Sequence, residues 1–143
     1  HKAENETSKR GFIINALINF TNDTYFAIDS NYKILIANNT LKDRFKASNL
    51  ELREGMLITD VLSEEAQKAW KPRYEKALAG ERLHFTEERK VGTNVLFLEV
   101  FVEPIRNDKA EVIGCAVVSR DITLQKEATD KALQLEAAIA KQN

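Results

Sequence analysis

VIGCAVVSRDIT, residues 112–123, is the stretch that decides the fold of this chain. Residues 112–118 are apolar on both alternating faces, which predicts a strand whose sheet is covered on both sides. A polar group that ends in Asp121 follows, and Thr123 can then cap a helix that continues to the end of the chain. The sequence therefore predicts a doubly covered strand that passes almost directly into a helix.

Two further strands precede this one. Segments 83–90 and 95–102 are rich in strand-forming residues, and turn formers follow each of them. In segment 95–102 the even positions are all apolar, whereas Glu99 marks the other face as partly solvated. We therefore expect three consecutive antiparallel strands with one face against the core.

The start of the chain predicts a helix followed by a hairpin. Apolar residues recur at helical spacing over residues 8–21, and a cluster of turn formers ends the pattern. Two strand-like runs, 25–28 and 33–37, then bracket a turn in which Asn31 can adopt a positive φ. This segment is interpreted as an amphipathic helix and a β-hairpin.

The middle of the chain predicts helices that pack on the sheet. Asn38 precedes a short helix with Leu41 and Phe45 one turn apart. Ser63 can cap a longer helix that runs to Ala79, where a glycine stops it. Neither helix is expected to be stable without the sheet.

Composition narrows the class of protein. The 143 residues carry 21 Lys and Arg against 22 Asp and Glu, so the net charge of −1 offers no field that would attract nucleic acid or an anionic membrane. A single cysteine excludes an internal disulfide. No apolar run approaches the ~20 residues that span a bilayer. The chain begins at His1 and ends within a helical pattern, so we expect a piece of a longer protein.

Residues that could carry catalysis are few. Cys115 is the only cysteine, and His84 is the only histidine besides the terminal one, so the pattern favours a buried thiol over a nucleophile with its base. The acidic pairs 64–65 and 87–88 fit solvated charge at a helix start and on a strand. The scattered glycines form no phosphate loop. We expect no catalytic residue and no metal site in this chain.

Three short motifs together resemble a PAS domain. Residues 104–108 (PIRND), 112–114 (VIG) and 119–123 (SRDIT) are similar to the C-terminal, or PAC, motif of that family. Residues 29–38 resemble its first hairpin and its helix-opening asparagine. Asn31-Tyr32 stand where the family usually has Asp-Gly, and Lys109-Ala110 lack the usual hairpin glycine. The resemblance covers roughly residues 14–125.

The resemblance implies an α+β fold with a five-stranded antiparallel sheet in spatial order 2-1-5-4-3. Short helices would enclose a pocket against one face, and flanking helices would stand at both ends. We divide the chain accordingly into an N-terminal flanking helix, 1–22, a sensor core, 23–122, and a C-terminal signalling helix, 123–143. By alternation along the strands and spacing along the helices, the expected pocket residues are Phe26, Ile28, Leu41, Phe45, Trp70, Leu83, Phe85, Leu98, Val100, Ala116 and Val118.

Two cofactor classes of the family are disfavoured. Flavin-adduct domains resemble one another in a Gly-x-Asn-Cys-Arg-Phe helix, which this chain lacks, because its cysteine lies in the last strand. Haem domains use a histidine on the long helix, and segment 63–79 contains none. A noncovalently bound flavin, a small organic ligand or no ligand at all remain. Because no charge stands among the expected pocket residues, we expect an apolar or neutral ligand if one is bound.

Such modules sense a small molecule, light or redox state and pass a displacement to an output domain such as a histidine kinase. The apolar spacing of 123–143 fits a coiled-coil linker, so we expect Asp121, Ile122 and Thr123 to relay the signal. Asp121 would hold the junction by accepting hydrogen bonds.

The first hypothesis is therefore a cytoplasmic input domain of a bacterial-type signalling protein. We expect it to form a homodimer through its flanking helices and to act on an output domain outside this chain. A dimerisation spacer whose interior is packed shut is the alternative from a different class. A small α+β enzyme is the third, and it would need a polar constellation inside the pocket.

Overall fold

The sheet and helices follow one another in the order that the sequence predicts. The computed structural model describes residues 2–142, so His1 and Asn143 of the predicted terminal segments lie outside the described residues. The elements are α1 (Lys2–Asn19), β1 (Thr24–Asp29), β2 (Ile34–Ala37), α2 (Asn39–Ala47), the 3-10 helix η1 (Ile58–Asp60), α3 (Glu64–Leu78), β3 (Leu83–Val91), β4 (Asn94–Arg106), β5 (Val112–Asp121) and α4 (Thr123–Gln142).

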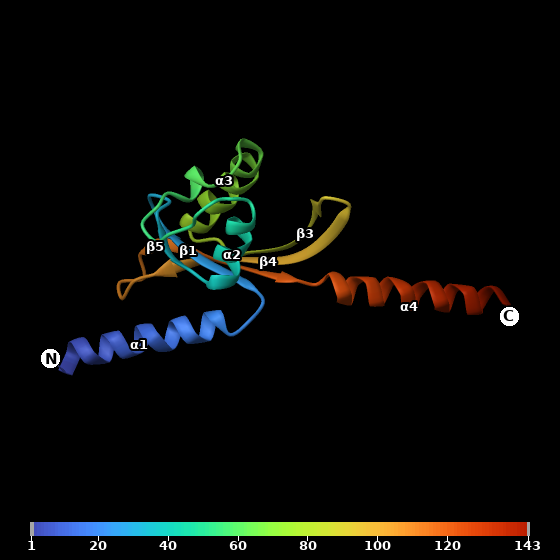
Figure 1. The fold of residues 1–143 in the computed structure, drawn as a ribbon, viewed down its shortest axis with the longest axis horizontal. Coiled ribbons are helices and arrows are strands. Elements are labelled where there is room, and N and C mark those ends of the chain that lie inside the picture. Colours follow the sequence, from blue (N-terminus) through green and yellow to red (C-terminus); the bar gives the residue numbers. More distant parts are fainter. Residues whose placement is uncertain (1, 143) are drawn as a thin grey trace.

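The five strands form one antiparallel sheet in the order β2-β1-β5-β4-β3, which confirms the predicted α+β fold (Figure 1). Short turns join β1 to β2, β3 to β4 and β4 to β5, because consecutive strands of a meander pair directly. The last strand, β5, hydrogen-bonds to β1 and β4 and therefore lies in the centre of the sheet. β5 is apolar on both faces, whereas helices α2, η1 and α3 cover one face of the sheet (Figure 1).

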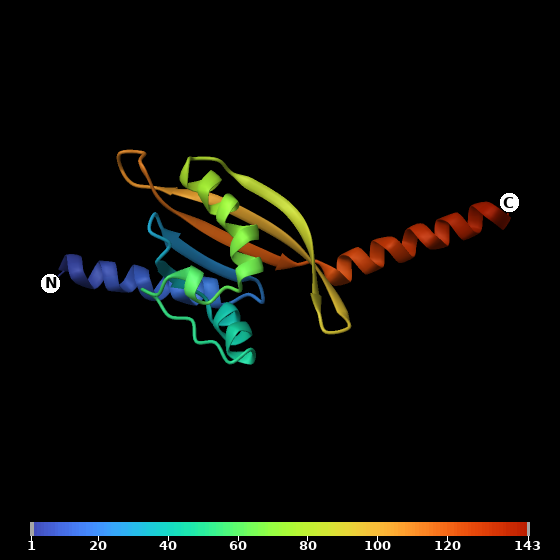
Figure 2. The same ribbon diagram turned by 90° about the horizontal axis from the view of Figure 1, so that it is seen from above.

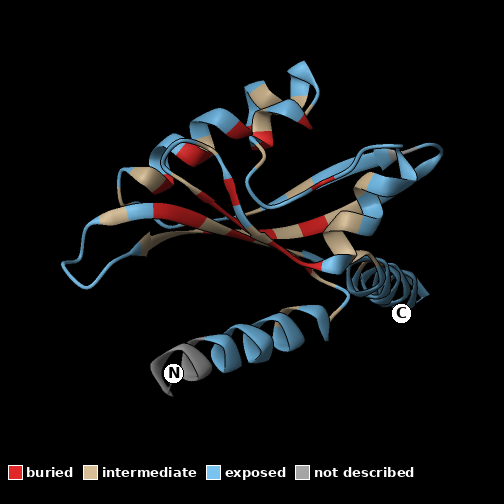
Figure 3. Cartoon of the chain, turned by 60° about the vertical axis from the view of Figure 1, so that its left-hand side comes forward, coloured by how far each residue is buried: buried red, intermediate tan, exposed pale blue. Residues whose placement is uncertain are grey.

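Helices α2, η1 and α3 cover one face of the sheet, and the two terminal helices lie outside that layer. Figures 1 and 2 show α3 above the sheet, α1 on the opposite side, and α4 projecting from the end of β5. Most residues of α1 and α4 whose side chains are described are exposed, whereas the buried residues gather where the sheet meets the helical layer (Figure 3). No described helix has a stretch that is both long and apolar enough to cross a membrane.

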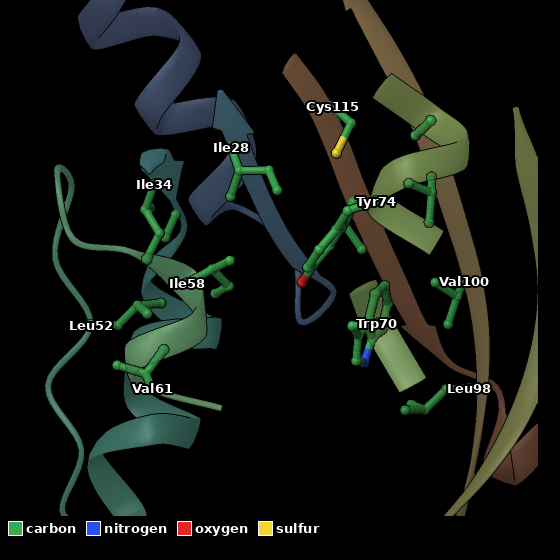
Figure 4. Packing of buried hydrophobic residues seen from close by; sticks show 14 residues of the cluster. Ile28, Ile34, Leu52, Ile58, Val61, Trp70, Tyr74, Leu98, Val100 and Cys115 are labelled. Carbon is green, nitrogen blue, oxygen red and sulfur yellow. The ribbon is translucent and has the colours of Figure 1, made fainter. Parts of the chain in front are cut away.

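The core lies between the sheet and the helical layer (Figure 4). Its strand residues come from the face of β1, β4 and β5 that faces α3, and its helical residues come from α3 and from the segment that contains η1. Burial of this many aliphatic and aromatic side chains, at ~25 cal/mol per Å² of apolar surface, is the main stabilising contribution to the fold. The buried cluster consists of Ile28, Ile34, Ala37, Leu52, Ile58, Val61, Trp70, Tyr74, Ala77, Leu98, Val100, Val102, Cys115 and Val117.

The predicted face of β5 was wrong. Phe26 pairs with Val117 and Ile28 pairs with Cys115, so the odd-numbered residues of β5 face the helical layer. Ala116 and Val118 therefore point to the opposite side of the sheet, away from the core cluster. Alternation carries no signal in a strand that is apolar on both faces, and an error of one residue moves every side chain to the other side.

The two turns that lack the family's usual glycine adopt positive φ nonetheless. Tyr32 has φ +67° and Ala110 has φ +63°, whereas Asn31, which we expected in this conformation, is not among the positive-φ residues. The Asp29 carboxylate accepts hydrogen bonds from the backbone N–H groups of Asn31 and Lys33, which fixes the turn around Tyr32. The side-chain bonds of Asp29 therefore override the intrinsic preference of asparagine for the left-handed region.

Candidate functional site

A cavity of about 320 Å³ lies between the helical layer and the sheet. Strands β1, β3 and β5, helices α2 and α3, and the segment around η1 supply most of its walls. Its volume is at the lower end of the ~300–1,000 Å³ that ligand sites occupy. The lining residues are Thr24, Phe26, Leu41, Arg44, Phe45, Ser48, Leu50, Ile58, Leu62, Ala66, Trp70, Tyr74, Arg89 and Ser119.

Four predicted pocket residues line this cavity: Phe26, Leu41, Phe45 and Trp70. They come from β1, α2 and α3, so the structure brings together residues that are far apart in the sequence. The other predicted residues belong to the packed interior around the cavity or lie elsewhere. Ile28, Leu98 and Val100 are buried in the core cluster, Leu83 and Phe85 pack against that cluster, and Ala116 and Val118 lie on the other face of the sheet.

Aromatic rings form the α3 side of the cavity. Trp70 stacks on Tyr74 with ring centroids 5.5 Å apart, and Phe85 approaches Trp70 at 6.3 Å. In Figure 4 Trp70 and Tyr74 lie on successive turns of α3 and face the aliphatic residues of the η1 segment. Burial raises the pKa of the Tyr74 phenol above its usual value, so its hydroxyl stays protonated at neutral pH. This wall is apolar and uncharged.

Two arginines line the cavity, and the predicted charge-free pocket is therefore wrong. Arg44 follows Leu41 by three residues on α2, and Arg89 follows Phe85 by four residues on β3. Helical spacing of three and strand spacing of an even number keep residues on one side of their element. The sequence therefore held the signal for both arginines, but the prediction selected apolar residues only.

A carboxylate bridges two arginines beside the aromatic wall. Glu87 accepts a hydrogen bond from Arg89 at 3.1 Å through Oε1 and pairs with Arg73 at 3.0 Å through Oε2. The Arg73 guanidinium lies 4.6 Å from the Trp70 ring and 4.2 Å from the Phe85 ring. Its Nη1 is buried without a hydrogen-bond partner. The stacking compensates part of the desolvation of this cation.

The junction between β5 and α4 is fixed by hydrogen bonds to its own residues and to β4. Asp121 Oδ1 accepts hydrogen bonds from the hydroxyl and, at 3.0 Å, from the backbone N–H of Thr123. Thr123 Oγ1 accepts from Phe97 N at 3.0 Å, and Ile122 N donates to Phe97 O at 2.8 Å. These contacts place the predicted relay residues at a single point where α4 begins.

The hydrogen bonds of this junction affect the pKa of Asp121. The hydrogen bonds from the Thr123 hydroxyl and backbone lower the pKa of Asp121 below its usual value, and the positive charge of Arg44 acts in the same direction. Arg44 lines the cavity, whereas Asp121 holds the start of α4. The electrostatic environment of the junction thus includes a residue of the cavity wall.

Asn38 is a buried polar residue that links four segments, and sequence reasoning assigned it only to the opening of a helix. Its Oδ1 accepts hydrogen bonds from Tyr25 N at 3.1 Å and Leu41 N at 3.2 Å, and its Nδ2 donates to Ile18 O and Asp23 O, both at 2.8 Å. All four bonds go to the backbone, so the side chain fixes the relative positions of α1, β1 and α2.

The candidate catalytic residues lie apart. Cys115 is fully buried in the core, and burial raises the pKa of its thiol to about 11. His84 pairs with Glu99 at 3.0 Å and stacks on Phe101, which places it on the opposite face of the sheet from Cys115. Among the residues that the structure describes, no group of three or more His, Cys, Asp or Glu side chains could hold a metal ion.

The fold and the site define an α+β protein in which helices enclose a small cavity against a central antiparallel sheet. A family profile described as "PAS fold" matches residues 20–127. The chain therefore belongs to the PAS family, and its fold is that of a sensory domain. A search of curated protein sequences found no significant match.

Solved structures with the same fold include sensor domains. The PAS domain of Bordetella pertussis BvgS is 16% identical, with a TM-score of 0.62 over 92% of this chain and 98% of that one. A sensory box sensor histidine kinase from Vibrio cholerae is 16% identical, with a TM-score of 0.56 over 82% and 93% of the two chains. The phage VqmA–DPO complex is 16% identical, with a TM-score of 0.63 over 99% of this chain and 62% of that one.

Proposed function

We propose that this chain is a cytoplasmic sensory input domain that binds a small ligand in its cavity and relays the binding event through α4 to an output domain. The observation that carries the proposal is that one strand, β5, both lines the cavity and leads into the start of α4. Ser119 of β5 lines the cavity, and Asp121, two residues further along the same face, holds the start of α4. A displacement of β5 by a ligand therefore reaches α4 without passing through another element.

The junction is built so that such a displacement changes hydrogen bonds rather than packing. Ile122 and Thr123 are bonded to Phe97 of β4, so a shift of β5 against β4 alters the bonds that orient the first turn of α4. A ligand moves this equilibrium only by the difference between its affinities for the two arrangements. The proposal therefore requires a ligand that contacts β5 or its neighbours differently in the two states.

The neighbours support a histidine kinase as the output domain and a small molecule as the signal. Sensor histidine kinase domains are among the solved structures that share this fold. VqmA, another of them, was solved as a complex with DPO. Because these proteins share only 16% identity with this chain, the kinase and the ligand are part of the proposal.

We also propose that the domain acts as a homodimer through its flanking helices. Phe12 and Leu17 of α1 and Phe20 directly after it are 73%, 66% and 89% exposed, and Leu135 and Ile139, at helical spacing on α4, are 57% and 59% exposed. Large apolar side chains exposed at several positions along a helix favour a contact with another chain. A second copy would cover it.

The test of the relay uses the full-length parent protein and its output activity. Asp121→Ala removes the acceptor of both Thr123 bonds and is expected to reduce the response to ligand while the cavity still binds it. Asp108→Ala, in the exposed turn between β4 and β5, is the control. Unchanged signalling by Asp121→Ala would refute the relay.

The alternative function, a spacer without a ligand, is favoured by the small size of the cavity and the dense packing around it. Native mass spectrometry of the purified domain, followed by thermal denaturation with candidate ligands, separates the two functions. A ligand at 100 times its dissociation constant adds about 2.7 kcal/mol to the free energy of unfolding. A copurified small molecule or such a shift supports the sensor, and their consistent absence supports the spacer.

A further inference from the structure

The cavity contains a feature that the proposed ligand-binding function leaves unexplained: two cations line it. Arg44 enters the lining from α2 and Arg89 from β3, and no Asp or Glu is among the lining residues whose side chains the structure describes. The remaining lining is aliphatic, aromatic or hydroxylic. Both arginines are exposed residues, so they meet the cavity at its solvent side, and an apolar ligand would gain nothing from their charge.

We propose that the ligand is a small amphipathic anion, with an apolar body against the aromatic wall and a carboxylate or similar head group held by Arg44 and Arg89. This inference rests on the proposed ligand-binding function and specifies the chemistry of that site. Planar guanidinium groups bind carboxylates through paired hydrogen bonds, which makes arginine the side chain best suited to this recognition.

The side chains around the cavity carry a net positive charge that a ligand could neutralise. The Glu87 carboxylate is bonded to Arg89 and is shared with Arg73. Among the residues whose side chains the structure describes, no carboxylate forms an ion pair with Arg44. The charge of Arg44 acts on the Asp121 carboxylate, so Asp121 is also counted. The group then contains three arginines and two carboxylates, namely Arg44, Arg73 and Arg89 with Glu87 and Asp121. The surplus of one positive charge matches a single anionic group.

Hydroxyl groups near the arginines supply further donors. Thr24, Ser48 and Ser119 line the cavity, and Thr24 is buried. Thr24 and Ser119 are cross-strand partners on the same face of the sheet, so their side chains are neighbours. A carboxylate accepts up to about four hydrogen bonds, and two guanidinium groups with adjacent hydroxyls can provide them.

The remaining walls fix the body and size of the ligand. Phe26, Phe45, Trp70 and Tyr74 present uncharged rings to the cavity. A volume of about 320 Å³ suits a small molecule. The walls therefore favour a short aliphatic or aromatic acid.

An anion at this site would act on the signalling junction directly. The positive charge of Arg44 helps to keep Asp121 ionised, and Asp121 holds Thr123 at the start of α4. A carboxylate that pairs with Arg44 competes for the same charge and weakens its effect at Asp121. Binding and the state of α4 are then coupled by one side chain of the cavity wall.

The experiment compares three probes with chains of equal length: octanoate, 1-octanol and octylamine. Their affinities are measured by isothermal titration calorimetry, both with the 143-residue chain and with the full-length parent protein. Octanoate is expected to bind about tenfold more tightly than 1-octanol, since a charge-assisted hydrogen bond contributes ~1.5–3 kcal/mol and each 1.4 kcal/mol is tenfold. Arg44→Gln and Arg89→Gln should each remove most of that difference. Arg82→Gln, an arginine outside the cavity with an 81% exposed side chain, should not.

The outcomes separate this inference from the function on which it rests. If 1-octanol binds as tightly as octanoate, or if octylamine binds most tightly, the proposal of an anionic ligand is refuted. The proposed ligand-binding function is then still supported, because a small molecule binds. Binding of octanoate that neither arginine substitution weakens also overturns it. If none of the probes binds, the anion is refuted, and the presence or absence of a copurified molecule decides the ligand-binding function. Circular dichroism of each variant establishes that it is folded.

Discussion

The side-chain amide of Asn38 donates a hydrogen bond to the carbonyl oxygen of Ile18 at 2.8 Å, so the last turn of α1 is bonded to the residue that caps α2. A second contact of the same kind runs from Thr40 Oγ1 to Thr21 O at 3.1 Å. Helix α2 carries Leu41, Arg44 and Phe45 into the cavity. Under the proposed relay, a displacement of the cavity wall would reach α1 as well as α4.

Replacing Asn38 should destabilise the domain strongly. Asn38→Ala leaves the backbone groups of Tyr25, Leu41, Ile18 and Asp23 without their partner in a buried site. We expect a loss of about 3 kcal/mol in the free energy of unfolding, because a single unsatisfied buried group costs ~1–3 kcal/mol. Asn39→Ala, next in sequence and exposed, should change it by less than about 0.5 kcal/mol. Urea denaturation measures the free energy of unfolding of both variants. Equal losses in Asn38→Ala and Asn39→Ala would contradict the role assigned to Asn38.

Gly114 is required where β5 crosses β1. A Cβ atom at this position would lie 2.2 Å from the carbonyl oxygen of Ile28, which is backbone and cannot move without separating the strands. Gly114→Ala should therefore lower the free energy of unfolding by several kcal/mol, on the order of ~3 or more. Gly11→Ala, in α1 with no atom within 4 Å, is the control and should be neutral or stabilising by up to ~1 kcal/mol. Thermal denaturation that ranks the two variants equally would refute the steric argument.

The positive φ of Ala110 offers a stabilising substitution. An L-residue in the left-handed region costs ~1–2 kcal/mol, and glycine removes this cost at the expense of a more flexible unfolded chain. Ala110→Gly should raise the free energy of unfolding by about 0.5–1 kcal/mol. The same substitution at Ala128, inside α4, should not stabilise, since glycine is ~1 kcal/mol worse than alanine within a helix. Chemical denaturation measures the free energy of unfolding of both variants. A loss of stability in Ala110→Gly would contradict the claim that the positive φ of Ala110 costs stability.

The fold was predictable because its signals are local and repeated. Alternation in 95–102 identified the core face of β4, and Leu98, Val100 and Val102 are indeed buried there. The motif at 119–123 marked the passage from β5 to α4. By contrast, the face of β5 could not be read from residues 112–118, because both faces of this strand are apolar.

The candidate site was predictable only in its apolar part. Phe26, Leu41, Phe45 and Trp70 followed from the same periodicity that builds the core. Arg44 and Arg89 share those faces, but a charged residue on an apolar face is ordinarily solvated at the edge of its element. Only the three-dimensional arrangement shows that α2 and β3 bring both cations to one cavity.

Charge placed on α1 should dissociate the proposed dimer. Phe12 and Leu17 are exposed apolar residues of α1, and burying a carboxylate between two copies would cost far more than the apolar contact contributes. Phe12→Glu with Leu17→Glu should therefore convert a dimer into a monomer without lowering the thermal stability of the core. Lys9→Glu, also exposed on α1, should leave the dimer intact. Sedimentation equilibrium at high micromolar concentration measures the change, and a monomeric wild-type protein would contradict the dimer.

The buried thiol of Cys115 should make the domain labile at alkaline pH. Burial raises its pKa to about 11 from an ordinary value of 9.0, so between these two pH values the unfolded chain releases a proton that the folded chain retains. Stability is fully present below about pH 9 and falls as the pH rises toward 11, by ~1.4 kcal/mol for each unit of difference in pKa. Buried Tyr74, whose pKa is also raised, adds to the loss above pH 10.

The contribution of the thiol is isolated by a variant that cannot ionise. Cys115→Ala loses packing at every pH, but its free energy of unfolding should decline less steeply than that of the wild type between pH 8 and pH 10.5. Urea denaturation under reducing conditions at several pH values gives both curves. The stability advantage of the wild type over Cys115→Ala should shrink as the pH rises from about 9 toward 11, because only the wild type releases the Cys115 proton on unfolding. Parallel curves would show that the thiol ionises as easily in the folded domain as in the unfolded chain, and the burial of Cys115 would then not control its ionisation.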